Sequence, residues 1–400
     1  MRLRSDARDV VVVGGGPAGS AVATMLRQRG HDVVLVDEAR FPRDKVCGES
    51  VSPEAWRILA EIGAVRTVRA LGPHAIRGMA LTAPDGTGFR GLYGQGRDPG
   101  FAVRRESLDA ALLGHARAEG VEVREGTRAT GLVRDPRGVV CGITCENGRG
   151  PETVHARIVV GADGRRSRVA RALGLLREHR RLRKFAVRGH WEAMQGLSEL
   201  GEMHVGGGGY CGVAPLPLSL ANVAFVLDRA EMRAAGGDLE GFYRRTLARW
   251  PRLAERLQGA RLVGPPRAIG PLALEARGVW APGALLVGDA AGFYDPFTGE
   301  GVTLALRSAE LATEAAHAAL RTADPSRLST YAARRREATR DKFRFNRLLQ
   351  QVVGRPWLAN LVARRLAARP ALADRLVGIA GDFVPARTAL GPSFLRDLLL

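Results

Sequence analysis

The chain has 400 residues, an apolar fraction of 46% and a formal net charge of +19. This length predicts about two or three domain-sized units around sizeable cores. No stretch reaches the roughly 18 apolar residues of a membrane span. The first predicted strand starts near residue 9, so cleavage of a secretory leader there would destroy it. We therefore expect a cytoplasmic protein.

The positive charge is almost entirely arginine, since Lys45, Lys184 and Lys342 are the only lysines. The chain has no nucleic-acid-binding motif and few aromatic residues. We therefore interpret the excess of positive charge as arginines on solvated faces, and we expect no nucleic-acid partner. An anionic membrane surface or an anionic carrier stays open as a partner. No histidine or further cysteine completes a zinc-binding spacing, which predicts no metal site. The cysteines, which we expect to be structural thiols in a reducing compartment, are Cys47, Cys141, Cys145 and Cys211.

Residues 10–38 predict a strand, a glycine turn, a helix and a second strand. The turn fits G-x-G-x-x-G, with its glycines at 14, 16 and 19. The first glycine allows the tight turn, the second lets the backbone approach a pyrophosphate, and the third lets the helix pack close to the strand. Asp37 ends the second strand, about 20 residues further on, where an acid accepts from a ribose hydroxyl. The neighbouring Glu38 is the alternative acid.

A loop, FPRDKVCGES, follows at 41–50, and a helix is predicted over 52–63 with Ser52 as its cap and Pro53 at its first position. Short strands are predicted over 74–104 and a helix over 105–119. Further strands lead to a second glycine turn, Gly161-Ala162-Asp163-Gly164.

Residues 180–271 alternate like antiparallel strands, with one helix over 239–257. From Gly283 the parallel pattern returns with ALLVGDAAGFYDPFTGEG, and a helix is predicted from Val302 to about Leu320. The fold class is α/β with an α+β insert. We expect a discontinuous dinucleotide-binding domain (1–73, 105–179 and 272–330), a substrate-binding sheet domain (74–104 and 180–271) and a C-terminal helical segment (331–400).

Three glycine motifs in this order resemble the glutathione-reductase-like FAD-binding flavoproteins of the group A monooxygenase type. The loop PRDKVCGE at 42–49, with GDAAGFYDPFTGEG, is most similar to the geranylgeranyl reductase family. The resemblance implies an FAD-binding Rossmann domain, bound FAD, and NAD(P)H as a transient reductant. It also implies a hydrophobic small-molecule substrate.

The resemblance implies roles for individual residues. The first glycine motif and Asp37 would hold the adenosine half of FAD, Arg105 and the second motif would lie near its phosphates, and Asp289 would bind the ribityl chain. The helix that starts after Gly299–Gly301 would direct its positive end at the flavin. The implied cofactor-binding residues are Gly14, Gly16, Pro17, Ala18, Gly19, Asp37, Glu38, Lys45, Cys47, Gly48, Arg105, Asp163, Gly164, Gly288, Asp289, Pro296, Gly299, Glu300 and Gly301.

Cys47 and Glu49 are the candidate catalytic residues, and a structural turn with a buried cysteine is the alternative. A general acid role for Glu49 would need a raised pKa. Trp191, Tyr210 and Phe225 on the predicted strands line either a substrate cavity or a core.

The resemblance leaves several reactions open. The first expectation is hydroxylation or epoxidation of an aromatic, polyketide-like or isoprenoid molecule, as in secondary metabolism, because group A flavoproteins are most often hydroxylases. Saturation of isoprenoid double bonds is the alternative. Similar halogenases have a lysine between the FAD turn and the sheet domain and a WxWxIP segment. Here no lysine lies between Lys45 and Lys184, and residues 209–215 lack the tryptophans. A non-catalytic flavin electron-transfer protein would not need the sheet domain.

The segment from Tyr331 onward combines arginines with apolar residues near helical spacing. A basic amphipathic helix can lie on an anionic membrane or pack on its own protein. We therefore expect a partial lid, a lipid or carrier surface, or packing on the FAD domain. Its apolar positions are Phe343, Phe345, Leu348, Leu349, Val352, Trp357 and Leu361.

Overall fold

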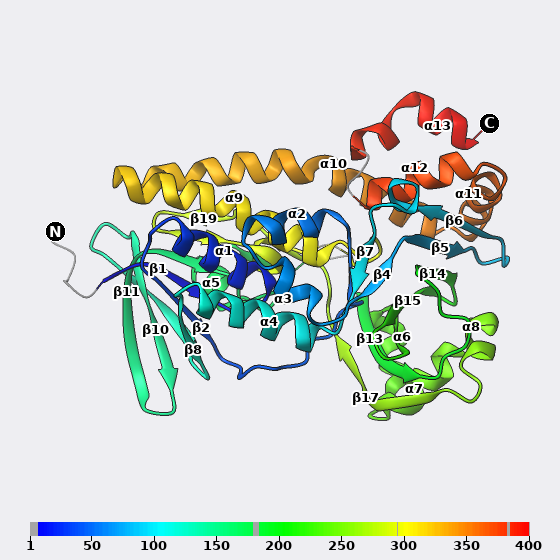
Figure 1. Cartoon of the computed structure of the whole chain (residues 1–400), viewed down its shortest axis with the longest axis horizontal. Coiled ribbons are helices and arrows are strands. Elements are labelled where there is room, and N and C mark those ends of the chain that lie inside the picture. Colours follow the sequence, from blue (N-terminus) through cyan, green and yellow to red (C-terminus); the bar gives the residue numbers. More distant parts are fainter. Residues whose placement is uncertain (1–6, 179–183, 294, 382–384, 400) are drawn as a thin grey trace.

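A computed structural model describes residues 7–178, 184–293, 295–381 and 385–399. The molecule is elongated, with a mostly parallel sheet toward one end and an antiparallel sheet toward the other (Figure 1). The C-terminal helices run along one side and end beside the antiparallel sheet. The chain crosses between the two sheets several times, so the antiparallel part is an insertion and not a separate C-terminal unit.

The parallel sheet has the strand order β19-β20-β11-β1-β2-β8, and β10 pairs with β11 and β9. Its central strand β1 pairs in parallel with both β2 and β11. Valines and leucines fill these central strands because both faces of a covered parallel sheet are buried. The strands are β1 (Arg8–Val13), β2 (Val33–Asp37), β8 (Glu122–Glu125), β9 (Arg128–Arg134), β10 (Val140–Asn147), β11 (Gly150–Gly161), β19 (Trp280–Ala281) and β20 (Ala284–Leu286).

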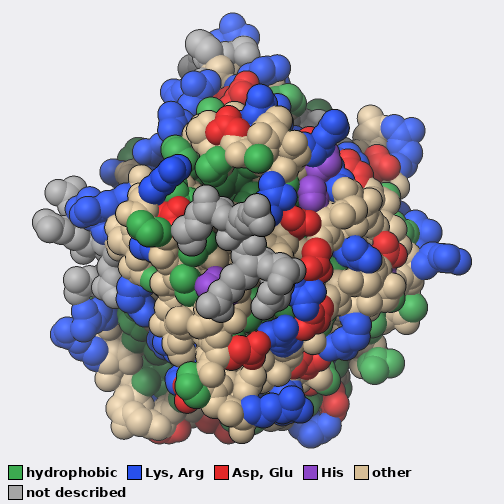
Figure 2. Space-filling view, turned by 90° about the vertical axis from the view of Figure 1, so that its left-hand side faces the viewer, with side chains coloured by type: hydrophobic (Ala, Val, Ile, Leu, Met, Phe, Trp, Pro, Cys, Tyr) green, Lys and Arg blue, Asp and Glu red, His purple; other side chains and the backbone are tan. Residues whose placement is uncertain are grey.

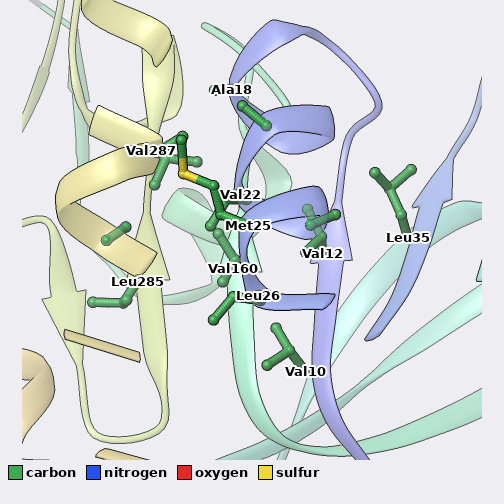
Figure 3. Packing of buried hydrophobic residues seen from close by; sticks show 14 of the residues in the cluster. Val10, Val12, Ala18, Val22, Met25, Leu26, Leu35, Val160, Leu285 and Val287 are labelled. Atoms are coloured by element: carbon green, nitrogen blue, oxygen red, sulfur yellow. The ribbon is translucent and has the colours of Figure 1, made fainter. Parts of the chain in front are cut away.

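Two helices, α1 (Pro17–Gln28) and α9 (Gly301–Thr322), pack beside each other on this sheet. Val10, Val12, Leu26 and Val160 are fully buried or nearly so and belong to one cluster between α1 and the strands (Figure 3). The other helices of this part are α2 (Glu54–Glu61), α3 (Val65–Arg69), α4 (Arg105–Ala118) and α5 (Arg168–Ala172).

The antiparallel part is a seven-stranded sheet with the order β17-β13-β16-β15-β14-β5-β6, in which only the pair β14 and β5 is parallel among the described strands. Helices α6 (Arg229–Met232), α7 (Leu239–Leu247) and α8 (Pro251–Arg256) belong to this part. Its strands are β5 (Gly78–Thr82), β6 (Gly88–Leu92), β13 (Lys184–Glu192), β14 (Leu200–Gly206), β15 (Gly209–Leu216), β16 (Leu220–Asp228) and β17 (Arg261–Ile269). Small sheets link the two parts: β3 (Ser50–Val51), β7 (Gly100–Ala102) and β4 (His74–Ile76) form one, and β12 (Leu176–Glu178) with β18 (Leu274–Ala276) forms another.

Two local predictions were wrong. The helix expected over 239–257 is two helices, α7 and α8, because Pro251 begins a new helix where its missing N–H is not needed. Ser52 does not cap α2; its hydroxyl donates to Thr303 Oγ1 at 2.7 Å and so joins the loop before α2 to α9.

The C-terminal segment contains α10 (Ser329–Val353), α11 (Pro356–Ala368), α12 (Pro370–Ala380) and α13 (Pro392–Leu399). Helix α10 packs on α9, whereas α11 and α12 cover the edge strand β6. Phe345 is buried in this packing, but the Trp357 side chain is 67% exposed. Apolar faces of the segment therefore pack on both parts of the molecule. Among the described helices, none is long and apolar enough to span a membrane.

Arginines on the surface are interleaved with acidic side chains. Figure 2 shows this on the face at the N-terminal end, where blue and red groups alternate without one large basic patch. Arg8, for example, pairs with both Asp32 and Glu122. Exposed pairs of this kind contribute only about 0–1 kcal/mol each.

Candidate cofactor and substrate site

The first glycine turn is shaped by backbone packing at two of its glycines. A Cβ at Gly14, whose φ is +107°, would lie 2.5 Å from the Ala162 carbonyl oxygen, and one at Gly19 would lie 1.8 Å from the Gly14 carbonyl oxygen. Gly16 differs, because a Cβ there would meet only the Arg43 guanidinium, at 3.7 Å. Its lack of a side chain leaves open space at the start of α1, where Pro17 and Ala18 follow. A helix N-terminus with such an approach suits a phosphate group.

Asp37 lies at the end of β2 and ties this turn to the strand. One of its carboxylate oxygens accepts from the Gly15 N–H at 2.6 Å, and the other accepts from the Ala39 N–H at 2.8 Å. Asp37 is buried and Glu38 is exposed. Asp37 is thus the acid held against the glycine turn, and its contact with a ribose stays a prediction.

A cavity of about 200 Å³ opens between the two sheets. It brings together the start of α1, the 45–52 loop, the second glycine turn, the antiparallel sheet, and residues 288–293 and 296–302. The first of these two stretches includes the 3₁₀ turn η3 (Gly288–Ala291). The predicted site residues that line it are Gly16, Pro17, Ala18, Lys45, Cys47, Gly48, Arg105, Gly164, Gly288, Asp289, Pro296, Gly299 and Gly301. The predicted residues outside its lining are Gly14, Gly19, Asp37, Glu38, Glu49, Asp163 and Glu300.

Charged groups of the lining gather on the side of the parallel sheet. Lys45 Nζ lies 4.0 Å from Asp289 Oδ2, and burial lowers the pKa of Lys45 although Asp289 opposes this. Arg105 donates two hydrogen bonds of 2.8 Å to Asp109. Burial alone would lower the pKa of Arg105, but Asp109 and then Cys47 raise it above its usual value. Arg105 is therefore a fixed cation beside the Cys47 thiol.

Asp163 organises the second glycine turn instead of facing the cavity. Its carboxylate accepts from the Ser167 hydroxyl and, at 2.6 Å, from the Arg168 N–H, at the start of α5. Burial raises the pKa of Asp163, against these hydrogen bonds. At this turn Ala162, Gly164 and Arg165 line the cavity, and Gly164 has a φ of +74°, which favours glycine.

Glu49 lies behind the cavity wall, 1% exposed, and is held by three donors. Its Oε1 accepts from the Arg105 backbone N–H at 2.9 Å, and its Oε2 from His190 Nε2 at 2.6 Å and Asn222 Nδ2 at 2.9 Å. Burial alone would raise the pKa of Glu49, but the hydrogen bond from His190 and the other two bonds bring that pKa below its ordinary value. This direction is opposite to the raised pKa that a general acid needs.

The same amide of Asn222 also donates to the Cys47 carbonyl oxygen at 2.8 Å, so it anchors the loop that carries the thiol. On the other side of the imidazole, Arg188 approaches His190 Nδ1 at 3.0 Å. Because a guanidinium can only donate, Nδ1 accepts and the proton of a neutral His190 is on Nε2, directed at Glu49. Arg188 pairs in turn with Asp44.

Sequence reasoning missed His190, Asn222 and Arg188. The one available signal was their alternate positions on two predicted strands, which places them on one face of a sheet. That signal does not say which face of the sheet they occupy, or that the 41–50 loop lies against this face.

A second buried carboxylate, Asp295, joins the 295–301 loop to the sheet and to α10. It accepts from the Tyr210 hydroxyl at 2.6 Å and from Gln350 Nε2 at 2.9 Å, and it pairs with Lys184 Nζ at 3.2 Å. Burial, followed by Asp295, raises the pKa of Tyr210 well above its usual value, so the phenol stays protonated. Glu300, which the cavity does not reach, is paired with Lys342 of α10.

Only one of the three predicted aromatic side chains faces the cavity. Tyr210 lines it beside Phe297, at a ring distance of 5.0 Å. Trp191 and Phe225 point to the other face of the sheet, where Phe225 stacks on Tyr243 of α7. For Trp191 and Phe225 the core is therefore the right alternative, because their strand positions place them on the face that α7 and α8 cover.

Comparison with known proteins agrees with this geometry. A family described as FAD binding domain matches residues 7–199. A menaquinone reductase of Mycolicibacterium smegmatis is 31% identical over 324 residues, which cover 76% of this chain and 75% of that protein. A digeranylgeranylglycerophospholipid reductase of Methanosarcina mazei is 31% identical over 329 residues, or 80% of this chain and 78% of that protein. The solved flavin-dependent halogenase CmlS superposes with a TM-score of 0.82 at 24% identity, over 97% of this chain and 78% of that one, which shows a shared fold.

Proposed function

Because the chain belongs to the FAD-dependent oxidoreductases of the geranylgeranyl reductase family, we propose that it reduces carbon–carbon double bonds in an apolar, isoprenoid-type molecule. The observation that supports this reaction most is the sequence similarity of the chain, over about three quarters of its length, to two proteins named as reductases. The apolar sheet side of the cavity supports the substrate class.

The residues present fit FAD. The open space at Gly16 admits a pyrophosphate at the start of α1, and Asp37 is already held at the turn beside it. Lys45, Arg105 and Asp289 supply polar contacts along the cavity, and α9 begins at Gly301 with its positive end facing it. When bound and reduced, FAD supplies a hydride.

The protein's own residues would supply the rest of the reaction. Reduction of one double bond requires a hydride at one carbon and a proton at the other. Of the two candidate catalytic residues, only Cys47 reaches the cavity, so we assign proton delivery to its Sγ, with solvent restoring the proton afterwards. Arg105 stays charged beside this thiol. Glu49 then acts as a positioning residue, because it fixes the backbone of this loop and does not touch the cavity.

NADH or NADPH is proposed as the reductant. Family members of the group A type bind it transiently on the FAD face, and the chain contains one G-x-G-x-x-G motif in a strand–helix context. If neither nucleotide bleaches the flavin absorbance of the anaerobic holoenzyme, with or without substrate, another electron donor acts here.

Oxygenation of an apolar aromatic or isoprenoid molecule is the second candidate. The observation that favours it is the same apolar sheet side of the cavity, since an oxygenase must also exclude water from its reacting centre. Halogenation is disfavoured despite the halogenase fold similarity, because no lysine lies between Lys45 and Lys184.

One experiment separates reduction from oxygenation. The holoenzyme is reduced anaerobically, farnesol and geranylgeraniol are added, and products are analysed by mass spectrometry before and after air is admitted. A product that has gained two hydrogens without air supports the proposed reductase. A product that appears only after oxygen is admitted, and that carries one labelled atom when the oxygen is ¹⁸O₂, would overturn the proposed reductase in favour of the oxygenase.

A further inference from the structure

The antiparallel sheet forms a shallow floor under the cavity where its side chains are smallest. Side chains of one face line the cavity, and those between them are buried against α7 and α8. On four adjacent strands, the cavity-facing positions near the middle of the sheet are Ala186, Ala224, Gly212, Ala214 and Gly201. Larger side chains, among them Met79, Met203, Tyr210 and Val226, stand around them.

Gly212 is at the centre of this floor, opposite Ala224 on β16 and Met203 on β14. Both Gly212 and Ala224 are only partly buried, whereas their neighbours Cys211 and Phe225 are fully buried on the opposite face. The partial exposure of the two small residues is thus exposure to the cavity.

The fold does not require glycine at position 212. Its φ is not positive, and β15 pairs with both neighbours there without a bulge. A Cβ at Gly212 would lie 3.6 Å from Met203 Cε and 3.7 Å from the Glu202 carbonyl oxygen, which are ordinary van der Waals contacts. On the same strand Gly209 is different, because a Cβ there would lie 2.0 Å from the Val226 carbonyl oxygen.

Glycine inside a strand weakens it, so it often marks a place where a ligand or another backbone approaches closely. No described backbone fills the space above Gly212, since that space is the cavity. We propose that Gly212, together with Ala224, is the specificity-determining position of the site and admits the flat, uncharged unsaturated part of the substrate. This inference rests on the proposed function for its substrate class.

The chemistry of the floor agrees with a trans-alkene segment of a prenyl chain. Such a segment is planar around each double bond, so it can lie against a surface of glycine and alanine residues. Four charged residues of the lining, Lys45, Arg105, Arg165 and Asp289, come from the FAD-binding part. The one on the floor strands, Glu202, pairs its carboxylate with Arg256 of α8. A charged group over Gly212 would therefore lose its hydration without a partner of opposite charge on the floor.

The test is equilibrium dialysis of labelled farnesol with the holoenzyme of the wild type and of Gly212→Ala, Gly212→Val and Ala224→Val. The expected result is a Kd that rises in steps, by at least tenfold for each valine variant, with FAD content and melting temperature close to wild type. Ala224→Val keeps the test decisive if Gly212→Val fails to fold. Gly148→Val is the matched control, because Gly148 lies in an exposed turn and its φ is not positive. A Cβ added at Gly148 would have no other atom within 4 Å.

Equal farnesol binding by wild type and the folded valine variants would overturn the assignment of Gly212, whatever reaction the enzyme performs. A stepwise loss of binding with no reduced product from the wild type would keep the assignment and overturn the proposed reaction. Absence of saturable farnesol binding to the wild type would overturn both.

Discussion

Glu49 offers a quantitative test of how the site is held together. Its carboxylate satisfies three buried donors from the Arg105 backbone, His190 and Asn222, and it is 1% exposed. Removing one partner of a buried charged network costs about 3–5 kcal/mol, because the remaining groups lose their acceptor. We therefore expect Glu49→Ala to lower the free energy of unfolding by that amount.

The backbone at Glu49 adds a second, opposing effect. Its φ is +60°, a conformation that disfavours residues with a Cβ by about 1–2 kcal/mol. Glu49→Gly loses the same hydrogen bonds but relieves this strain. The glycine variant should therefore be about 1 kcal/mol more stable than the alanine variant, which is the reverse of the order at an ordinary extended position.

The assay is urea unfolding of the holoenzyme at a fixed FAD concentration, followed by circular dichroism at pH 7 and at lower pH. The pKa of Glu49 is lower in the folded state, so its stabilisation is present above the unfolded value of about 4.3 and is lost as the pH falls through the folded value. The difference between wild type and Glu49→Gln should shrink over that window. A decrease of less than about 1 kcal/mol in the free energy of unfolding for Glu49→Ala at pH 7 would refute the reasoning. Three unsatisfied buried donors should destabilise the folded state by more than that.

Three further predictions follow from the same structure. Gly16→Ala should fold but retain less FAD through gel filtration, because its Cβ enters the space left for the pyrophosphate; unchanged FAD content would remove Gly16 from the site. Lys184→Met leaves the buried Asp295 without its cation and should lower the free energy of unfolding by about 3 kcal/mol in urea titrations, and an unchanged midpoint would show that Gln350 and Tyr210 suffice. We also propose that the basic C-terminal helices, with Trp357 exposed, bind anionic vesicles at low salt; flotation without bound protein would leave these helices a packing role alone.

The sequence by itself determined the cofactor half of this protein. The turn at 14–19 requires glycine for local reasons: Gly14 has a φ of +107°, and a Cβ at Gly19 would lie 1.8 Å from the Gly14 carbonyl oxygen. The valine runs of β1 and β2 likewise predict buried parallel strands, because both of their faces are covered. Such constraints act between near neighbours in the chain, so spacing and residue type are enough to find them.

Tertiary structure alone decided which side chains face the cavity. Period-two alternation places Trp191 and Phe225 on one face of the sheet and Tyr210 and Gly212 on the other, but it does not say which face meets α7 and which meets the cavity. Glu49 is 141 residues from His190 and 173 from Asn222, and no local pattern links them. Their contact exists because the 41–50 loop of one domain packs on the sheet of the other, and that packing turns a candidate acid into the buried anchor of the Cys47 loop.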